Sequence, residues 1–139
     1  MNQKICYIKD MQVFNWNEIL NNPQAAAKLC SQGTGISIGS FDGIHSGHRK
    51  LLETLTENCH KQNLLAGVVT FSRPLPSIKR SANYPGDLTT LQQRLEIFAK
   101  FNLDFAIVVD FDEKFASRTG TEFLDLMVQL CNMKVLVEG

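Results

Sequence analysis

A chain of 139 residues is long enough to form one domain with a hydrophobic core of its own. Hydrophobic residues make up 44% of it and charged residues 20%, which is ordinary globular usage and argues against intrinsic disorder. The 14 basic residues balance the 14 acidic ones, so the chain lacks the positive surplus of a protein that binds a polynucleotide.

Cysteine usage and hydropathy indicate a reduced, cytoplasmic protein. The four cysteines form no C-x-x-C pair, and no apolar run is long enough for a signal peptide or a membrane span. We therefore expect no nucleic-acid partner and no membrane partner. Cys59 precedes His60, but no second ligand pair lies near them in sequence, so we expect a partly buried structural thiol and no protein-ligated metal.

The first 29 residues carry only a weak pattern. Short apolar runs at residues 5–8 and 11–16 predict one strand and one short helix. A clearer strand follows at residues 36–39, and it ends in small residues before a helix that should begin near His45. The apolar spacing predicts that this helix packs on a sheet through Leu51, Leu52, Leu55 and Cys59.

A second strand and helix follow. Residues 64–71 form an apolar run without polar alternation, as in a central strand covered on both faces. An irregular segment rich in proline and turn-forming residues comes next, and Thr90 with Gln93 then forms a capping-box pattern that starts a helix. The side chains expected to be buried by this helix are Leu91, Leu95, Phe98 and Ala99.

The last elements repeat the pattern. Phe105 to Val109 predicts a strand, Thr119 with Glu122 forms another capping box, and residues 135–137 predict a final strand. The helix between them should bury Phe123, Leu126, Met127 and Leu130. Strands that alternate with amphipathic helices predict an α/β fold, a parallel sheet with helices on both faces, in a single domain over residues 1–139.

The most informative segment, residues 38–48, lies between a predicted strand and a predicted helix. A helix N-terminus at the carboxyl end of a parallel strand offers free N–H groups and partial positive charge to a phosphate. Gly39, Gly43 and Gly47 let the backbone approach such a group closely. His45 and His48 are three residues apart, so both imidazoles should project from one side of the first helical turn toward it.

This histidine pair has two other interpretations. An isolated H-x-x-H near a helix start is often a chance feature of the cap, but the glycine-rich strand-to-helix context favours the phosphate role. A metal site would need further ligands that the segment does not supply. Histidines that donate to phosphate oxygens would stabilise the negative charge that develops during nucleotidyl transfer.

These residues also carry a family resemblance. Residues 45–48 read HSGH, the H-x-G-H signature of the nucleotidylyltransferase superfamily, and residues 39–48 read GSFDGIHSGH, which resembles the G-x-F-D-G-x-H-x-G-H pattern of prokaryotic FAD synthetases. The resemblance runs over residues 35–139. Further matches, in the same order, are VTF at 69–71 with Pro74 and Pro76, LTTL at 88–91, and DFD at 110–112 with Phe115 and Phe123.

The resemblance implies a Rossmann-like nucleotidylyltransferase fold and the adenylyltransferase domain of a bifunctional riboflavin kinase/FMN adenylyltransferase. Such a domain transfers AMP from ATP to FMN, giving FAD and pyrophosphate, with Mg²⁺ held mainly by the ATP phosphates. His45 and His48 would be catalytic. The residues implied for ATP are Gly39, Ser40, Phe41, Asp42, Gly43, His45, Gly47 and His48, and those implied for the flavin are Thr70, Phe71, Pro74, Pro76 and Phe111.

The chain departs from the family pattern in two places. Leu75 replaces a common histidine between the prolines, and Ser72-Arg73 stands where an acidic residue is usual. Residues 135–139 match a strand that in the family continues into an Asp-Phe-x-Phe-Gly loop, so the domain is expected to be incomplete at its C-terminus, with a riboflavin kinase domain as the expected partner in the full gene product. Phe71 and Phe111 fit either stacking on the isoalloxazine ring or plain core packing.

Two other functions stay open. One is a different H-x-G-H transferase, acting on phosphopantetheine, nicotinamide mononucleotide, or a sugar or glycerol phosphate. The FDG prefix at residues 41–43 and the Thr-Phe-x-x-Pro-x-Pro segment argue against most of these. The other is a truncated or degenerate domain that binds a nucleotide without turnover.

Overall fold

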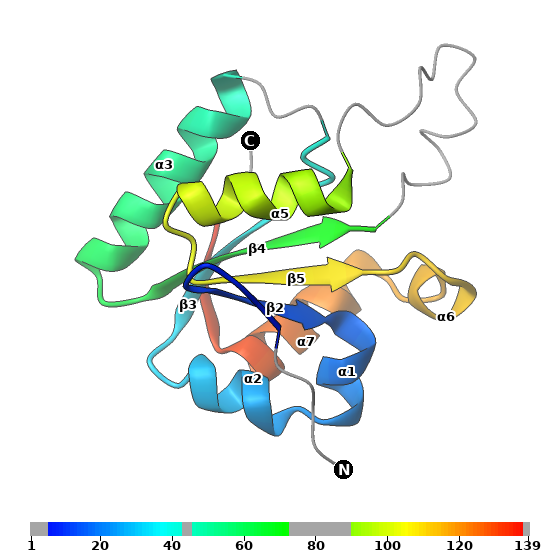
Figure 1. Cartoon of the computed structure of the whole chain (residues 1–139). Coiled ribbons are helices and arrows are strands. Elements are labelled where there is room, and N and C mark those ends of the chain that lie inside the picture. Colours follow the sequence, from blue (N-terminus) through cyan, green and yellow to red (C-terminus); the bar gives the residue numbers. More distant parts are fainter. Residues whose placement is uncertain (1–5, 43–45, 73–89, 138–139) are drawn as a thin grey trace.

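The computed structural model describes residues 6–42, 46–72 and 90–137 (Figure 1). Their strands form one sheet in the order β1-β2-β5-β4-β3-β6. The strands are β1 (Cys6–Ile8), β2 (Met11–Asn15), β3 (Thr34–Ile38), β4 (Leu65–Phe71), β5 (Phe105–Val109) and β6 (Met133–Leu136). The helices are α1 (Trp16–Asn21), α2 (Gln24–Leu29), α3 (Ser46–Lys61), α5 (Leu91–Lys100), α6 (Glu113–Ala116) and α7 (Gly120–Cys131).

The sheet is parallel except at one edge. β2, β5, β4, β3 and β6 pair in parallel with their neighbours, whereas β1 pairs antiparallel with β2. Helices α3 and α5 cover one face of the sheet, and α1, α2 and α7 cover the other (Figure 1). The expected α/β fold is therefore confirmed, with the correction that the sheet is mixed at its β1 edge.

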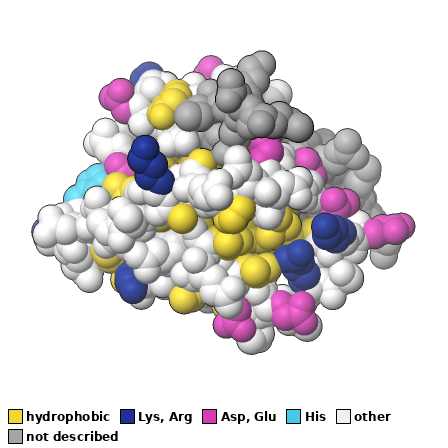
Figure 2. Space-filling view, turned by 90° about the horizontal axis from the view of Figure 1, so that it is seen from below, with side chains coloured by type: hydrophobic (Ala, Val, Ile, Leu, Met, Phe, Trp, Pro, Cys, Tyr) yellow, Lys and Arg dark blue, Asp and Glu magenta, His cyan; other side chains and the backbone are white. Residues whose placement is uncertain are grey.

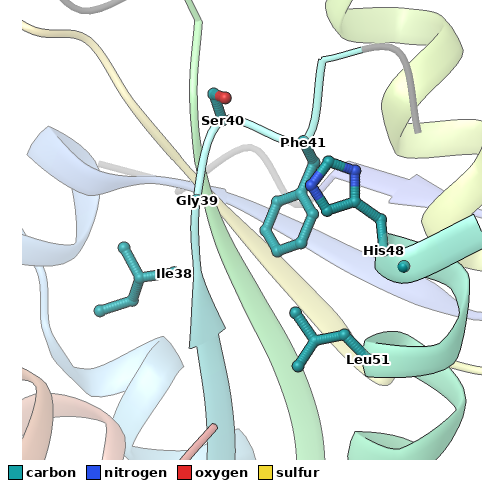
Figure 3. A pocket seen from close by; sticks show the side chains of 7 residues that line it. Ile38, Gly39, Ser40, Phe41, His48 and Leu51 are labelled. Carbon is teal, nitrogen blue, oxygen red and sulfur yellow. The ribbon is translucent and has the colours of Figure 1, made fainter. Parts of the chain in front are cut away.

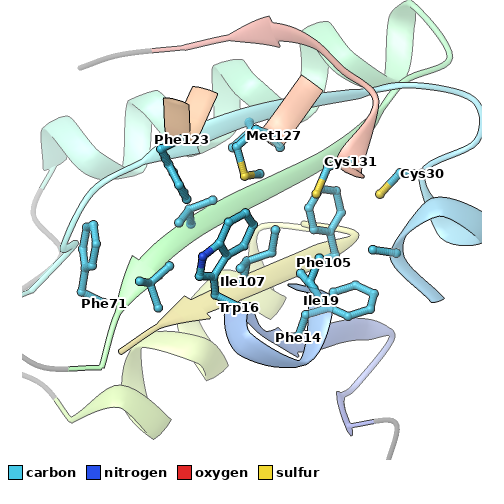
Figure 4. Close-up of a cluster of buried hydrophobic side chains, with 14 residues drawn as sticks. Phe14, Trp16, Ile19, Cys30, Phe71, Phe105, Ile107, Phe123, Met127 and Cys131 are labelled. Atoms are coloured by element: carbon cyan, nitrogen blue, oxygen red, sulfur yellow. The ribbon is translucent and has the colours of Figure 1, made fainter. Parts of the chain in front are cut away.

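The central strands are buried on both faces. In β5, Phe105, Ile107 and Val109 enter the core beneath α1 and α7, while Ala106 and Val108 enter the core beneath α3 and α5. β4 lies between β5 and β3, and its residues from Ala66 to Phe71 are all buried. Neither strand has a face toward solvent, which is why their sequences do not alternate between apolar and polar residues. Figure 4 shows the first of these cores, where Phe105 and Ile107 meet Trp16 and Phe123.

Both predicted capping boxes lie at helix starts. Thr90 Oγ1 accepts from the Gln93 N–H at 3.1 Å, and the Gln93 side chain accepts from the Thr90 N–H at 2.9 Å. Thr119 Oγ1 accepts from the Glu122 N–H at 3.1 Å. Burial differs in detail from the prediction, because several expected core residues are only partly buried, namely Leu51, Leu91, Ala99, Leu126 and Leu130.

The prediction of one strand and one helix before residue 30 is wrong. The segment forms two short strands and two short helices. Lys9 turns the chain between β1 and β2 with a φ of +53°, and Asn15 caps α1 by accepting from the Asn17 N–H at 2.9 Å. The first strands therefore form a hairpin that extends the sheet beyond β5.

The described cysteines are core residues. Cys30, Cys59 and Cys131 are buried free thiols, and Cys59, which was expected to be partly buried, is fully buried. Burial raises the pKa of the Cys59 thiol, and contact with Cys30 together with burial raises the pKa of Cys131. These thiols therefore stay protonated and pack as small apolar groups.

On the face seen from below, hydrophobic side chains gather near the middle, with acidic and basic side chains around them (Figure 2). Tyr7 and Val128 are the large hydrophobic residues most exposed to solvent among those described. Within residues 6–42, 46–72 and 90–137, none of the helices has the length and apolar character needed to span a lipid bilayer.

Gly67→Ala should destabilise the fold strongly. A Cβ at Gly67 would lie 2.2 Å from Cζ of Phe105, whose ring is fully buried in the neighbouring strand. Because that ring has nowhere to move, we expect the free energy of unfolding in urea to fall by about 3 kcal/mol.

The matched control is Gly120→Ala, where nothing lies within 4 Å of the added methyl group. Gly120 begins α7, and alanine favours helix, so a change of less than about 1 kcal/mol is expected there. An equal loss of stability in both variants would contradict the packing described for β4 and β5.

Candidate functional site

A cavity opens where β3 ends and α3 begins (Figure 3). Its volume is about 430 Å³, and it lies at the carboxyl end of a central parallel strand. This is the edge of an open parallel sheet at which ligands bind. We call it the turn cavity; its lining residues are Ile38, Gly39, Ser40, Phe41, Gly47, His48 and Leu51.

The turn of residues 39–42 gives this cavity its shape. The Gly39 N–H donates to the Val69 carbonyl at 3.0 Å, so the pairing of β3 with β4 continues one residue past β3. A Cβ on Gly39 would lie 3.3 Å from the Phe41 ring, so glycine leaves room for that ring to fold back over the backbone. Phe41 takes a left-handed φ of +53°, which costs roughly 1–2 kcal/mol for a residue with a Cβ.

Packing of the Phe41 ring offsets this strain. The ring is 3% exposed and makes edge-to-face contacts with His48, at 5.4 Å between centroids, and with Phe98 of α5, at 5.3 Å. Each such pair contributes about 1 kcal/mol beyond the burial of apolar area. Because the ring faces inward, the backbone of the turn is what Phe41 can offer to a ligand.

His48 lies in the first turn of α3, and its imidazole lies beside the Phe41 ring at the cavity (Figure 3). The N-terminus of this helix presents backbone N–H groups and partial positive charge to the same space. An imidazole next to a helix N-terminus is suited to bind an anionic group such as a phosphate.

The structure brings most residues of the predicted ATP set together. Gly39, Ser40, Phe41, Gly47 and His48 all line the turn cavity, and Asp42 follows directly in the same turn. Gly43 and His45 lie outside the described residues, so the predicted projection of both histidines from one side of the helix is untested.

Arg94 is part of this region, although no prediction from the sequence named it. It is 5% exposed, and its Nη1 donates to the Ser40 carbonyl at 2.6 Å, to Thr70 Oγ1 at 3.0 Å and to the Phe71 carbonyl at 3.0 Å. Its spacing of three residues from Leu91 and four from Phe98 places it on the buried face of α5. A cation on a predicted apolar face was the signal available in the sequence.

Thr70 holds the turn from the β4 side. It is fully buried, and its hydroxyl donates to the Ser40 carbonyl at 2.9 Å. The side chain that the family resemblance assigns to the flavin is therefore, in this structure, a contact between β4 and the turn. Its predicted contact with a flavin stays a prediction.

The aromatic residues predicted for the flavin side form a cluster. Phe71, Phe111 and Phe115 contact one another edge to face, with ring centroids 5.5 to 6.4 Å apart. Phe71 is buried in the core, while Phe111 and Phe115 are only partly buried. Core packing thus accounts for Phe71, and Phe111 keeps surface that a ring could cover. Pro74 and Pro76 lie outside the described residues.

Polar contacts join three strand ends beside this cluster. Ser72 Oγ donates to one carboxylate oxygen of Asp110, and the Asn15 side-chain amide donates to the other at 3.4 Å. The carboxyl ends of β2, β4 and β5 are thereby linked. Across the described ranges, no three His, Cys, Asp or Glu side chains gather closely enough to hold a metal ion.

Sequence comparison assigns this architecture to a family. The model of the FAD synthetase family matches residues 27–139. A bifunctional riboflavin kinase/FMN adenylyltransferase of Escherichia coli K12 is 36% identical over 109 residues, which cover 78% of this chain and 35% of that protein. A putative bifunctional riboflavin kinase/FMN adenylyltransferase of Geobacillus thermodenitrificans is 32% identical over 114 residues, covering 82% of this chain and 62% of that protein.

A solved structure shares the fold. The crystal structure of a protein named as a macrolide-efflux protein, from Streptococcus pneumoniae, superposes with a TM-score of 0.65 at 27% identity, covering 77% of this chain and 36% of that one. The chain spans about a third of the length of the Escherichia coli relative that it matches. Since the family match extends over most of the residues, including the turn and the start of α3, the chain belongs to the FAD synthetase family.

Proposed function

We propose that this chain carries an FMN adenylyltransferase site, which transfers AMP from ATP to the phosphate of FMN and forms FAD and pyrophosphate. One observation carries the proposal. In a chain of the FAD synthetase family, the glycine turn after β3 and His48 at the start of α3 line a single cavity at the carboxyl edge of the sheet. Relatives are named for the same reaction.

The reaction requires little covalent chemistry from the protein. A phosphate oxygen of FMN attacks the α-phosphorus of ATP, the bond to the bridging oxygen breaks, and pyrophosphate leaves with the negative charge. Donors fixed where this charge grows lower the barrier. His48 and the N–H groups at the start of α3 would supply such donors, and His45 would act beside them.

The other ligands follow from the same assignment. A Mg²⁺ ion would be held mainly by ATP phosphates, where it would neutralise phosphate charge. The flavin would lie toward the Phe111 and Phe115 rings, with Thr70, Phe71, Pro74 and Pro76 on that side. The protein would act in the cytoplasm, in FAD biosynthesis, with a riboflavin kinase domain as its partner.

Incubation of the chain with FMN, ATP and Mg²⁺ should yield FAD and pyrophosphate in equal amounts. Separation of flavins by chromatography measures the first product, and a coupled phosphate assay measures the second. Where the gene continues, the longer polypeptide is assayed in parallel. Nucleotide binding without FAD in both forms would identify a domain that does not turn over, and transfer to nicotinamide mononucleotide or phosphopantetheine instead would identify a different transferase.

His48→Ala should reduce adenylyl transfer about 100-fold through kcat, because a donor to the transition-state charge is lost. His48→Gln keeps a side-chain donor and should lose less. His60→Ala is the matched control, since that side chain is 46% exposed at the far end of α3 and pairs with Asp104 at 3.0 Å. Steady-state kinetics with varied ATP compares the variants, and unchanged turnover in His48→Ala would remove the residue from the site.

A further inference from the structure

Arg94 is a buried cation, and the described acceptors of its hydrogen bonds are two backbone carbonyls and one side-chain hydroxyl. Its guanidinium stays protonated at any pH the fold survives. Three described acceptors, the Ser40 and Phe71 carbonyls and Thr70 Oγ1, lie within 3.0 Å of Nη1. One nitrogen therefore joins α5 to the end of β4 and to the turn after β3.

The Ser40 carbonyl is the centre of this arrangement. It accepts from Arg94 Nη1 at 2.6 Å and from the Thr70 hydroxyl at 2.9 Å, so two donors fix its direction. The carbonyl and the following N–H of a trans peptide point in opposite directions. Fixing the Ser40 carbonyl toward β4 and α5 thus turns the Phe41 N–H away from them, and it sets the peptide plane that leads into the left-handed φ of Phe41.

Helix α5 contacts the turn a second time, one helical turn further on. Phe98 is four residues after Arg94 and therefore lies on the same face of α5. Its ring packs against the Phe41 ring, which packs in turn against His48. The backbone of the turn and the orientation of the histidine are both set from α5, by the Arg94 and Phe98 pair.

We propose that Arg94 is a positioning residue for the nucleotide. It holds the turn of residues 39–42 in the shape that meets the ATP phosphates and, through Phe41, fixes His48 at the cavity. This inference rests on the proposed function for the identity of the ligand, but not for the coupling of Arg94 to His48.

Two substitutions at Arg94 distinguish the effect of its charge from the effect of its hydrogen-bonding geometry. Arg94→Met keeps most of the side-chain volume and removes both the donors and the charge. Arg94→Lys keeps the charge but replaces the planar guanidinium by one ammonium group. Lys100→Met is the matched control, because it removes a positive charge from an exposed residue at the C-terminal end of the same helix.

The first readout needs no nucleotide. Ring-proton resonances of His48 depend on the Phe41 ring beside it, so Arg94→Met should shift them, while those of His60 at the other end of α3 stay in place. Arg94→Lys should shift the His48 resonances less, and Lys100→Met should leave them unchanged. The spread of the other amide resonances shows that each variant is folded.

The second readout is ligand binding and kinetics. Arg94→Met should weaken binding of α,β-methylene-ATP and raise the KM for ATP by about tenfold or more, with less than about threefold change in the KM for FMN, because the lost interactions act on the nucleotide side. If Arg94→Met does not fold, Thr70→Val serves in its place. It removes the second donor to Ser40 at nearly constant volume and should shift His48 in the same way.

The outcomes distinguish the two proposals. Wild-type protein that makes no FAD overturns the proposed function, while a selective His48 shift in Arg94→Met still supports the positioning role. Folded Arg94→Met protein with unchanged His48 resonances and unchanged affinity for α,β-methylene-ATP overturns the positioning role, whatever the wild-type protein catalyses. If Arg94→Met raised the KM for ATP and the KM for FMN equally and shifted the resonances of both His48 and His60, Arg94 would be a general stabiliser of the fold. That result would also overturn the positioning role.

Discussion

Burial of β4 and β5 on both faces is the constraint from which the rest of the structure follows. Their side chains feed two separate cores, so helices must cover both sides of the sheet. Parallel strands joined by such helices cross over with one hand, and their carboxyl ends then collect at one edge. The turn after β3, the strand ends at Ser72 and Asp110, and the start of α3 meet there because of it.

The site itself depends on backbone geometry more than on exposed reactive groups. Gly39 leaves space for the Phe41 ring, and Phe41 has a strained, left-handed backbone conformation. Ring contacts with His48 of α3 and Phe98 of α5 stabilise that conformation. Among the described side chains that line the cavity, His48 is the titratable one. A phosphate site of this kind needs shape and partial charge, and both come from how the turn is supported.

The sequence predicted the parts of this structure that depend on local pattern. β4 and β5 were visible as apolar runs, α5 and α7 as capping boxes, and the turn as closely spaced glycines. The β1 and β2 hairpin was missed because its strands are short and because Lys9, rather than glycine, takes the positive φ. No local pattern indicates that a lysine will adopt that conformation.

The contacts that support the site could not be predicted from the sequence, for a different reason. Arg94 and Ser40 are 54 residues apart, and Thr70 meets both from a third element, so only the assembled sheet shows that they touch. The same holds for Phe115, whose ring meets Phe71 from a different segment. Sequence pattern predicts which side chains turn inward, but it does not tell which inward side chains become neighbours.

The distance along the chain between Ser40 and Arg94 has a consequence for how the protein acquires its site. A contact that closes a loop of this length costs chain entropy before it returns any stabilisation, so it forms after β3, β4 and α5 have docked. The turn of residues 39–42 should therefore take its final shape only after these elements have met. During synthesis on the ribosome, the glycine motif would emerge well before the helix that gives it its form.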